Sequence, residues 1–413
     1  MSVLVRPPKQ KVVYKEWLDS LSISQDAVKN RALEVLRHLP PPHPKYEEWR
    51  QTPIWNYLTK PLPLAEPETI QLKDEHIALV NGFPIISNHL PQNISIDVYS
   101  NLTDLPKGLR EKVHGLVSDS EYFAMANLAY SPAIVVIKAK GKVSKPLLIK
   151  HYLTQQAVSF PRILVILEDG TELAIDEIWE TTDGYKFSVF VGEAYLGKNA
   201  ILWWTKEQTG NKDNTIIDYT EASLQEGSRA SIFTYTTGTG FWRNMPHLRM
   251  RGPNSGGYMY GLTIAGEDSL FDNHTFMEHV APDTEGDEYY KGLVASGGKV
   301  VFNGRIYVHQ EAQGTNSYQS DRYIELDKDA YVFSRPQLEI FADDVKCTHG
   351  AAIGFVDTNA LLYMKMRGIM ESKAKYLIYK GFLGEIIEKC PNFVRDRWLT
   401  RIENDLQWVL NNK

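Results

Sequence analysis

The sequence predicts a mainly β protein that is flanked by helical regions. Between about residues 94 and 340, short runs rich in β-branched and aromatic residues alternate with turn signals. Before residue 40 and after residue 357, apolar residues instead recur every three or four positions, as they do on one face of a helix. We therefore expect an N-terminal helical region with a proline-rich loop at 1–93, a β core at 94–354 and a C-terminal helical domain at 355–413.

The N-terminal region begins with a predicted helix that ends at a proline cluster. Ser24 and Asp26 are helix start signals, and the prolines at 40–44 cannot continue a helix. Trp49 and Trp55 follow in a loop, and we interpret them as packing anchors. The apolar residues at helical spacing within 14–39 are Trp17, Leu21, Val28, Ala32, Val35, Leu36 and Leu39.

The β core contains several short predicted strands and no helix of useful length after about residue 130. A sandwich, a barrel and a β-solenoid all fit strands at such short, regular intervals. The sequence has no clean repeat that would single out a solenoid. The predicted strands include 133–137, 163–167, 187–191, 231–235, 299–302 and 305–308, and the turn signals lie at 168–170, 237–240, 254–257 and 296–298.

The C-terminal domain contains three predicted helices. Asp357 or Thr358 caps the first, which Gly368 ends, and Pro391 or Asn392 opens the third. We interpret these helices as a cap on the β core. The predicted apolar positions are Leu361, Leu362 and Met366 in the first helix, Ala374, Ile378, Phe382 and Ile386 in the second, and Val394, Trp398, Ile402, Leu406 and Leu410 in the third.

Composition argues against several classes of function. The net charge of −6 argues against a nucleic-acid partner, because a phosphate-binding surface shows an excess of basic residues. No apolar run is long enough for a membrane span, and the N-terminus lacks the pattern of a signal peptide, so we expect a cytoplasmic protein. The chain has neither a phosphate-binding loop nor a dinucleotide-binding turn. Acidic pairs such as Asp343 and Asp344 have the character of turn residues.

Cys347 and His349 are the candidate site residues. In an extended segment, side chains two positions apart share a face, so this thiol and this imidazole lie side by side. The pair suits iron, zinc, an iron–sulfur cluster or a Cys-His nucleophile. A closed metal site needs about four donors, so other residues, a second chain or a substrate must supply the rest. The alternative is a buried cysteine beside a core histidine. His274 and His279 lack the spacing of a zinc-protease pair, and we interpret them as structural.

Several motifs resemble one family. They are SRPQLEIFADDVKCTHGAAIG at 334–354, LLYMKMRGI at 361–369, FDNHT at 271–275 and FNGRIYV at 302–308. Together they resemble the SufB/SufD family of the Suf iron–sulfur cluster assembly machinery, most strongly over 270–390. The segment 46–52 is similar to the N-terminal tryptophan-arginine-threonine element of that family.

The chain departs from the family pattern at two positions. Gly286 and Glu288 stand where the family usually has a serine and a glutamine. Gly350 follows the motif histidine where the SufB branch usually has a glutamate, and the chain is shorter than that branch, so the resemblance favours SufD. A SufB-like paralogue is the alternative.

The resemblance implies a right-handed parallel β-helix and a scaffold that is not an enzyme. It implies that His349 and Cys347 contact a transient iron–sulfur cluster shared with a partner, with no cofactor bound tightly to the isolated chain. The implied partners are a SufB-like paralogue on the β-helix and a SufC-type ABC ATPase on the C-terminal helices, with a homodimer when the chain is isolated. A polysaccharide-active β-solenoid enzyme and a hydrolase using Cys347 and His349 are the alternatives.

Overall fold

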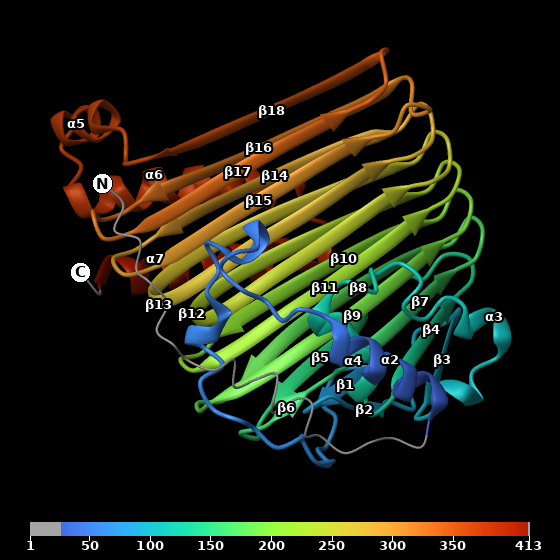
Figure 1. Cartoon of the computed structure of the whole chain (residues 1–413). Coiled ribbons are helices and arrows are strands. Elements are labelled where there is room, and N and C mark those ends of the chain that lie inside the picture. The colour runs from blue at the N-terminus through green and yellow to red at the C-terminus, as the bar shows by residue number, and fades with distance from the viewer. Residues whose placement is uncertain (1–25, 412–413) are drawn as a thin grey trace.

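The computed structural model describes residues 26–411 and confirms a mainly β fold with helices near both ends (Figure 1). Its centre is a β-solenoid of about eight turns, in which strands of successive turns pair in parallel. The resemblance therefore implied the correct architecture. Trp17 and Leu21 of the expected first helix lie outside the described residues. Helix α2 (Ala27–His38) begins after Asp26, whose carboxylate accepts hydrogen bonds from the backbone N–H groups of Val28 and Lys29.

The solenoid strands form two parallel stacks, which we call the first and second sheets. The first contains β1 (Ile77–Val80), β5 (Leu147–Leu153), β8 (Glu172–Thr181), β10 (Ile201–Gly210), the first halves of β12 (Arg229–Met250) and β13 (Gly256–His279), β14 (Glu285–Val294), β16 (Thr315–Glu325) and β18 (Val345–Gly354). The second contains β4 (Ile134–Ala139), β7 (Arg162–Leu167), β9 (Lys186–Leu196), β11 (Asn214–Leu224), the second halves of β12 and β13, β15 (Lys299–Val308) and β17 (Tyr331–Ile340). The short β6 (Val158–Ser159) pairs with β9.

Two antiparallel strands lie at the N-terminal end of these stacks. β2 (Phe83–Ile86) pairs with β1, and β3 (Ile94–Tyr99) pairs with β4. The strands therefore begin at Ile77, within the segment that the sequence assigns to the N-terminal region.

One predicted turn in the β core is a corner within a long strand, and one predicted break between two strands is absent. The turn signal at 237–240 is a corner inside β12, where Gly238 and Gly240 have φ of +96° and +86° and the register against β13 shifts. A side chain is disfavoured at both glycines by this backbone conformation and by the close approach of the carbonyl groups of Gly210 and Asn211. The runs 299–302 and 305–308 form the single strand β15, which pairs without a break with both β13 and β17.

Apolar side chains fill the space between the two sheets and also cover the outer face of each. Helix α2, the 3₁₀ turns η1 (Glu47–Trp49), η2 (Ile54–Asn56) and η3 (Leu102–Asp104), and helix α4 (Tyr122–Tyr130) contribute to a core against the outer face of the second sheet. The short α3 (Lys107–Arg110) lies between η3 and α4 in the chain. Trp49 is buried in this core, and the Arg243 guanidinium lies 4.0 Å from the centroid of the Trp49 ring. This burial confirms that Trp49 is a packing anchor.

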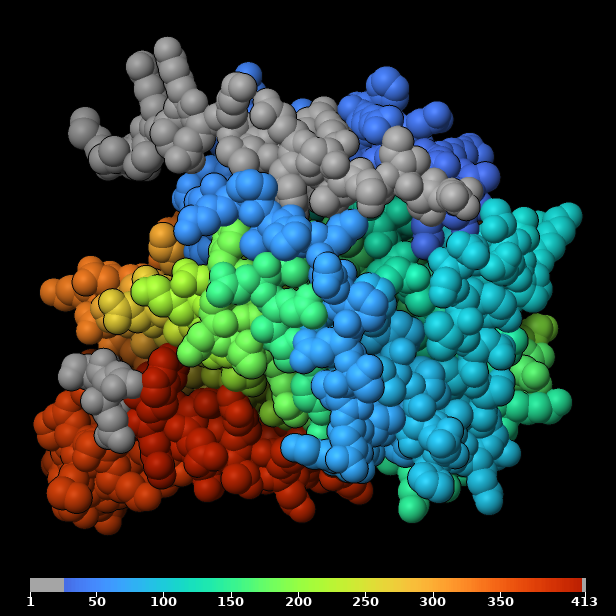
Figure 2. All heavy atoms as spheres, turned by 90° about the horizontal axis from the view of Figure 1, so that it is seen from below, coloured from blue at the N-terminus to red at the C-terminus, as the bar shows by residue number. Residues whose placement is uncertain are grey.

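The C-terminal helices are α5 (Thr358–Met366), α6 (Glu371–Lys389) and α7 (Asn392–Asn411). The Asp357 carboxylate caps α5 by accepting from the Asn359 N–H, and Gly368 takes φ +81° after it, so the predicted boundaries are confirmed. Helices α6 and α7 pack on the outer face of the first sheet. Figure 2 shows the C-terminal helices along one flank, with solenoid residues between them and N-terminal residues. None of the described helices has the length and apolar character needed to cross a membrane.

Candidate functional site

The C-terminal end of the solenoid is formed by β17 and β18, the last strands of the second and first sheets. In residues 26–411, β17 pairs with β15 and β18 pairs with β16, each over ten residues, and neither has a strand on its outer edge. Figure 1 shows β18 at the outer border of the strand stack. This end therefore presents two rows of unpaired backbone N–H and C=O groups, which are a template for pairing with another chain.

Cys347 and His349 both lie on β18, and their side chains share the face that is directed to the solenoid interior. Their partners in the register, Ser317 and Gln319 of β16, are buried in that interior. The half-buried Cys347 packs against the interior core together with Val345. His349 is exposed, because no further turn covers it. The predicted side-by-side placement on one extended face is confirmed.

A polar group lies one turn behind Cys347. The Ser317 hydroxyl is 3.1 Å from Nε2 of His279, and Nδ1 of that ring is 2.9 Å from the Thr284 hydroxyl. Burial lowers the pKa of His279 to about 3, so the ring is neutral. This is the structural role that we predicted for His279. Gly286 of the adjacent strand leaves room for this arrangement, because a Cβ there would collide with the Ser317 hydroxyl and the Met277 sulfur.

A second polar group lies behind His349. Gln319 donates from its amide nitrogen to Oε2 of Glu288 at 2.8 Å, and Thr275 donates to the other carboxylate oxygen. Glu288 is completely buried, and burial raises its pKa to about 7 even though both hydrogen bonds act to lower the pKa. Glu288, Gln319 and His349 occupy successive turns at matching register positions.

The second cysteine lies among the C-terminal helices in a different environment. Cys390 follows α6, is 1% exposed, and donates from its thiol to the Ile386 carbonyl. Burial raises the pKa of Cys390 to about 12. Cys390 is therefore a packing residue, and Cys347 is the cysteine at the open end.

The chain is similar to a known family over much of the solenoid. The model of the SufBD core domain, described as part of the SUF system for iron–sulfur cluster assembly, matches residues 151–382, more than half of the chain. The chain belongs to the SufBD family. The match includes most of the solenoid and both candidate residues, and it starts well before residue 270, where the motifs become strongest.

Individual relatives of this SufBD family chain cover almost its whole length. A SufBD family protein of Synechocystis is 27% identical over 93% of the chain and 90% of its own length. The chloroplastic protein ABCI7 of Arabidopsis thaliana is 27% identical over 91% and 86%. The iron–sulfur cluster assembly protein SufD of Escherichia coli is 25% identical over 84% and 85%.

The SufBD family chain supplies two soft donors at its open end. Within the part of the chain that the structure describes, no three His, Cys, Asp or Glu side chains are grouped as a metal site. A thiolate and an imidazole suit iron, but two donors do not complete a coordination sphere. Burial raises the pKa of Cys347, which makes it a poor candidate for the activated nucleophile of a hydrolase.

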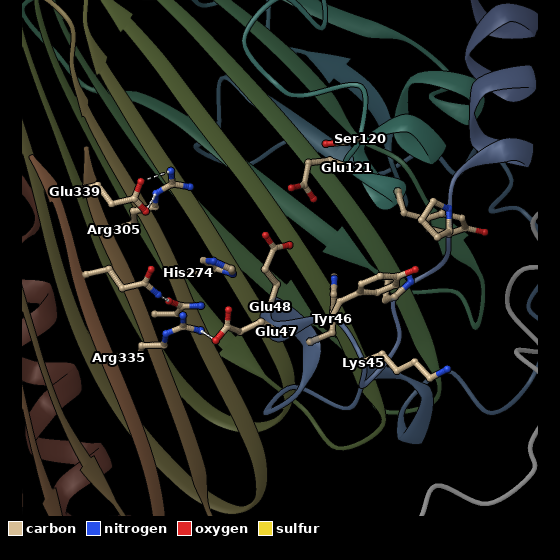
Figure 3. Close-up of a pocket in the computed structure, with 16 residues that line it drawn as sticks. Lys45, Tyr46, Glu47, Glu48, Ser120, Glu121, His274, Arg305, Arg335 and Glu339 are labelled. Atoms are coloured by element: carbon tan, nitrogen blue, oxygen red, sulfur yellow. Dashed lines mark hydrogen bonds and ion pairs between the residues drawn. The ribbon is translucent and has the colours of Figure 1, made fainter. Parts of the chain in front are cut away.

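A polar cavity of about 610 Å³ lies between the N-terminal segment and the second sheet (Figure 3). Two ion pairs line it, between Arg335 and Glu47 at 2.7 Å and between Arg305 and Glu339 at 2.9 Å. His274 also lines it, and burial together with the nearby Arg243 lowers the pKa of His274 well below its ordinary value. No sequence signal indicated this cavity, because its walls come from segments more than 200 residues apart.

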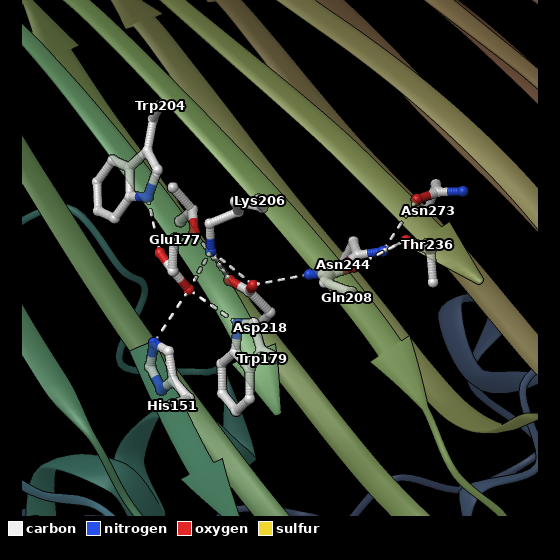
Figure 4. Close-up of polar contacts among 11 residues, drawn as sticks. His151, Glu177, Trp179, Trp204, Lys206, Gln208, Asp218, Thr236, Asn244 and Asn273 are labelled. Carbon is white, nitrogen blue, oxygen red and sulfur yellow. Dashed lines mark hydrogen bonds and ion pairs between the residues drawn. The ribbon is translucent and has the colours of Figure 1, made fainter. Parts of the chain in front are cut away.

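The solenoid interior also holds a buried charged cluster that the sequence did not reveal (Figure 4). Lys206 donates to both carboxylate oxygens of Asp218, at 2.6 and 2.7 Å, and lies 3.4 Å from Glu177. Burial alone would raise the pKa of Glu177, but Lys206, the nearby His151 and the hydrogen bond from Trp204 lower it to about 2. Removal of one partner from such a cluster would leave an uncompensated buried charge, which is strongly destabilising.

Proposed function

We propose that this chain is a non-catalytic, SufD-type scaffold subunit of a SufB–SufC–SufD-type complex in the cytoplasm. It holds a nascent iron–sulfur cluster between its open solenoid end and a SufB-like paralogue. The cluster is transient cargo that leaves the scaffold. Membership of a family that functions in iron–sulfur cluster assembly supports this proposal.

The open end is the observation that carries the proposal. It combines two long, unpaired strand edges with an incomplete set of soft donors, Cys347 and the exposed His349. A second chain that pairs with these edges supplies backbone partners and brings the missing donors to the same place. When the paralogue is absent, the same edges allow two copies of this chain to form a homodimer.

The C-terminal helices provide the proposed docking surface for the SufC-type ATPase. The stripes predicted on the second and third helices are largely used for packing, since Ile386, Val394 and Trp398 are buried against the solenoid. Exposed apolar side chains lie instead on and around α5, and they include Leu362, Tyr363, Met366 and Met370. An exposed apolar group of this kind marks a protein interaction surface. We therefore assign ATPase docking to the α5 surface.

The SufD-type assignment is preferred over the SufB type for two reasons. SufD of Escherichia coli matches over most of both chains. Gly350 stands where the SufB branch usually has a glutamate. A side chain at Gly350 meets no described atom within 4 Å, so the fold itself does not require glycine there.

Reconstitution tests the proposal. The purified chain is mixed with a SufB-like paralogue and a SufC-type ATPase and is supplied with iron and sulfide under anaerobic conditions. We expect a stable three-component complex that accumulates a cluster, whereas the chain alone retains no cluster and hydrolyses no ATP. Strong ATP turnover by the isolated chain, or a complete cluster held by it, would contradict the scaffold assignment.

A further inference from the structure

The buried side-chain amide of Gln319 has a nitrogen that is hydrogen bonded and an oxygen that has no hydrogen-bond partner among the described residues. Its nitrogen donates to Glu288 on the preceding turn. Its oxygen Oε1 is buried and accepts no hydrogen bond from any residue in 26–411. A buried amide oxygen without a partner costs free energy, so native structures nearly always supply a donor.

The following turn is one place from which a donor for this oxygen can come. Gln319 lies between Glu288 on one side and His349 on the other in the register of β14, β16 and β18. The backbone of β18 on that side pairs with β16.

Only one side chain on that face of β18 carries an N–H group. The interior-facing positions are Val345, Cys347, His349, Ala351 and Ile353. The three aliphatic residues have no donor, and a thiol is a weak one. The imidazole of His349 is therefore the donor that this face of β18 can offer to the Gln319 oxygen. The two groups are not hydrogen bonded in the structure, and the exposed ring lies at the open end, where it can turn toward the amide.

We propose that Gln319 is a positioning residue for His349. Its carbonyl oxygen, oriented by the hydrogen bond to Glu288, accepts the N–H of the imidazole and fixes a single tautomer. The other ring nitrogen then carries the lone pair and is directed to the open end, where a metal of the nascent cluster binds. Metal-ligating histidines generally donate their second ring N–H to a carboxylate or carbonyl in this way. This inference rests on the proposed ligand role of His349.

The packing around Gln319 agrees with an amide held in one orientation. A Cβ on Gly304 of β15 would collide with the Gln319 amide nitrogen, so glycine at this position leaves the space that the amide occupies. Glu288 in turn is held by Thr275 on β13. Three strands therefore fix the group that orients His349.

Nitrogen NMR of the full chain with ¹⁵N-labelled histidine tests the proposal, with the His349 signals identified by their loss in His349→Ala. At a pH where the ring is neutral, we expect two well-separated ring-nitrogen resonances, one for the N–H and one for the lone-pair nitrogen. In Gln319→Leu, which is similar in size but has no amide, we expect these resonances to move toward the averaged position of a freely exchanging imidazole. His279 serves as the internal reference, because its two hydrogen bonds remain.

Two substitutions at Glu288 provide a second test that does not depend on the folding of Gln319→Leu. Glu288→Gln keeps an acceptor for the Gln319 amide, so the separated resonances are expected to persist. Glu288→Leu removes the acceptor, so the separation is expected to decrease. Averaged His349 resonances in the wild-type chain, or unchanged separation in a folded Gln319→Leu chain, overturn the inference.

The inference and the proposed function can fail separately. Averaged resonances together with loss of cluster accumulation in His349→Ala would refute the positioning role and leave the ligand role intact. Separated resonances that depend on Gln319, together with normal cluster accumulation in His349→Ala, would refute the ligand role alone.

Discussion

The two ends of the solenoid differ in how their edge strands are treated. At the N-terminal end, each sheet is followed outward by a short antiparallel strand, β2 with four residues and β3 with six. At the C-terminal end, β17 and β18 each run for ten residues in parallel with their neighbour and have no such cover in the described chain. Short edge strands are a common protection against unwanted pairing. One end is therefore covered by short strands, whereas the other presents two long free edges.

The candidate donors lie only at the open end, and their loss has the largest expected effect. We expect His349→Ala to abolish cluster accumulation on the assembled complex while the melting temperature of the chain stays nearly unchanged, because the imidazole is exposed. Iron and sulfide per complex and thermal melting are measured on the same preparations. Normal cluster loading by this variant would refute the ligand role.

His279→Ala is the matched control for that experiment. His279 is buried and hydrogen bonded through both ring nitrogens, so its removal leaves a cavity and unpaired hydroxyl groups. We expect a destabilisation of about 1–3 kcal/mol. A similar loss of stability in His349→Ala would show that His349 too serves the core.

Proline in β18 distinguishes pairing at the open end from other modes of association. Successive N–H groups of a strand alternate in direction, so one of Ala351 and Ala352 directs its N–H to the free edge and the other directs its N–H to β16. We expect proline at the alanine whose N–H is directed to the free edge to weaken binding of the paralogue about tenfold or more, with little loss of folding. Proline at the other alanine is expected mainly to destabilise the chain.

A proline introduced at the closed end of the solenoid is the control for the β18 variants. Ser95→Pro in β3 is expected to leave paralogue binding unchanged in sedimentation or co-purification measurements. Equal loss of binding for Ser95→Pro and for the β18 variants would show that the two ends do not differ in function.

The C-terminal helices allow a second comparison, between the exposed apolar residues of the α5 surface and the apolar residues of α7 that are buried against the solenoid. Met366 is 78% exposed, so Leu362→Glu combined with Met366→Glu is expected to remove ATPase binding without loss of stability. Trp398 is fully buried on α7 beside Tyr235, and Trp398→Ala is expected to cost about 3–5 kcal/mol. Retained ATPase binding by the α5 double variant in a pull-down would show that the docking surface lies elsewhere.

Local signals predicted the ends of the molecule better than its centre. The boundaries of α5 depend on Asp357 and Gly368, which act within one helical turn, and the sequence located both. On α6 the buried face includes Tyr379, Leu383 and Ile387, whereas the predicted Ile378 and Phe382 are only half-buried. Apolar and charged residues are not separated onto two faces of this helix, so spacing alone could not select the buried face.

The solenoid could be recognised only through the family resemblance. Its turns pair residues about 30 positions apart without a sequence repeat, so neither the register nor the interior neighbours can be derived from local patterns. Alternation along one strand correctly placed Cys347 beside His349. The alignment of Glu288 and Gln319 behind His349 depends on the register of three strands, which could not be predicted from the sequence. The one sequence signal for this group was that Glu288 departs from the family pattern.

That departure leads to the last prediction, a pH dependence of stability that originates behind the open end. The pKa of Glu288 is about 7 in the folded chain against an ordinary value of 4.5, so the folded state binds this proton more tightly than the unfolded state. Its contribution to stability is therefore fully present below about pH 4.5 and is lost as the pH rises to 7. The loss is on the order of 3 kcal/mol.

Glu288→Gln removes this titration and isolates its effect. Denaturant unfolding at pH 5 and pH 8 gives the change in the free energy of unfolding for both chains, and we expect the wild-type chain to lose more than the variant. The buried Asp321, whose pKa burial raises to about 6, acts in the same direction but is present in both chains and cancels in the comparison. Equal pH dependence in the two chains would mean that Glu288 does not change its protonation on unfolding in this range. A larger loss in the wild-type chain would show that β14, two turns behind His349, contains a carboxyl group that titrates near neutral pH. The glutamine that the family usually has at this position cannot titrate in this way.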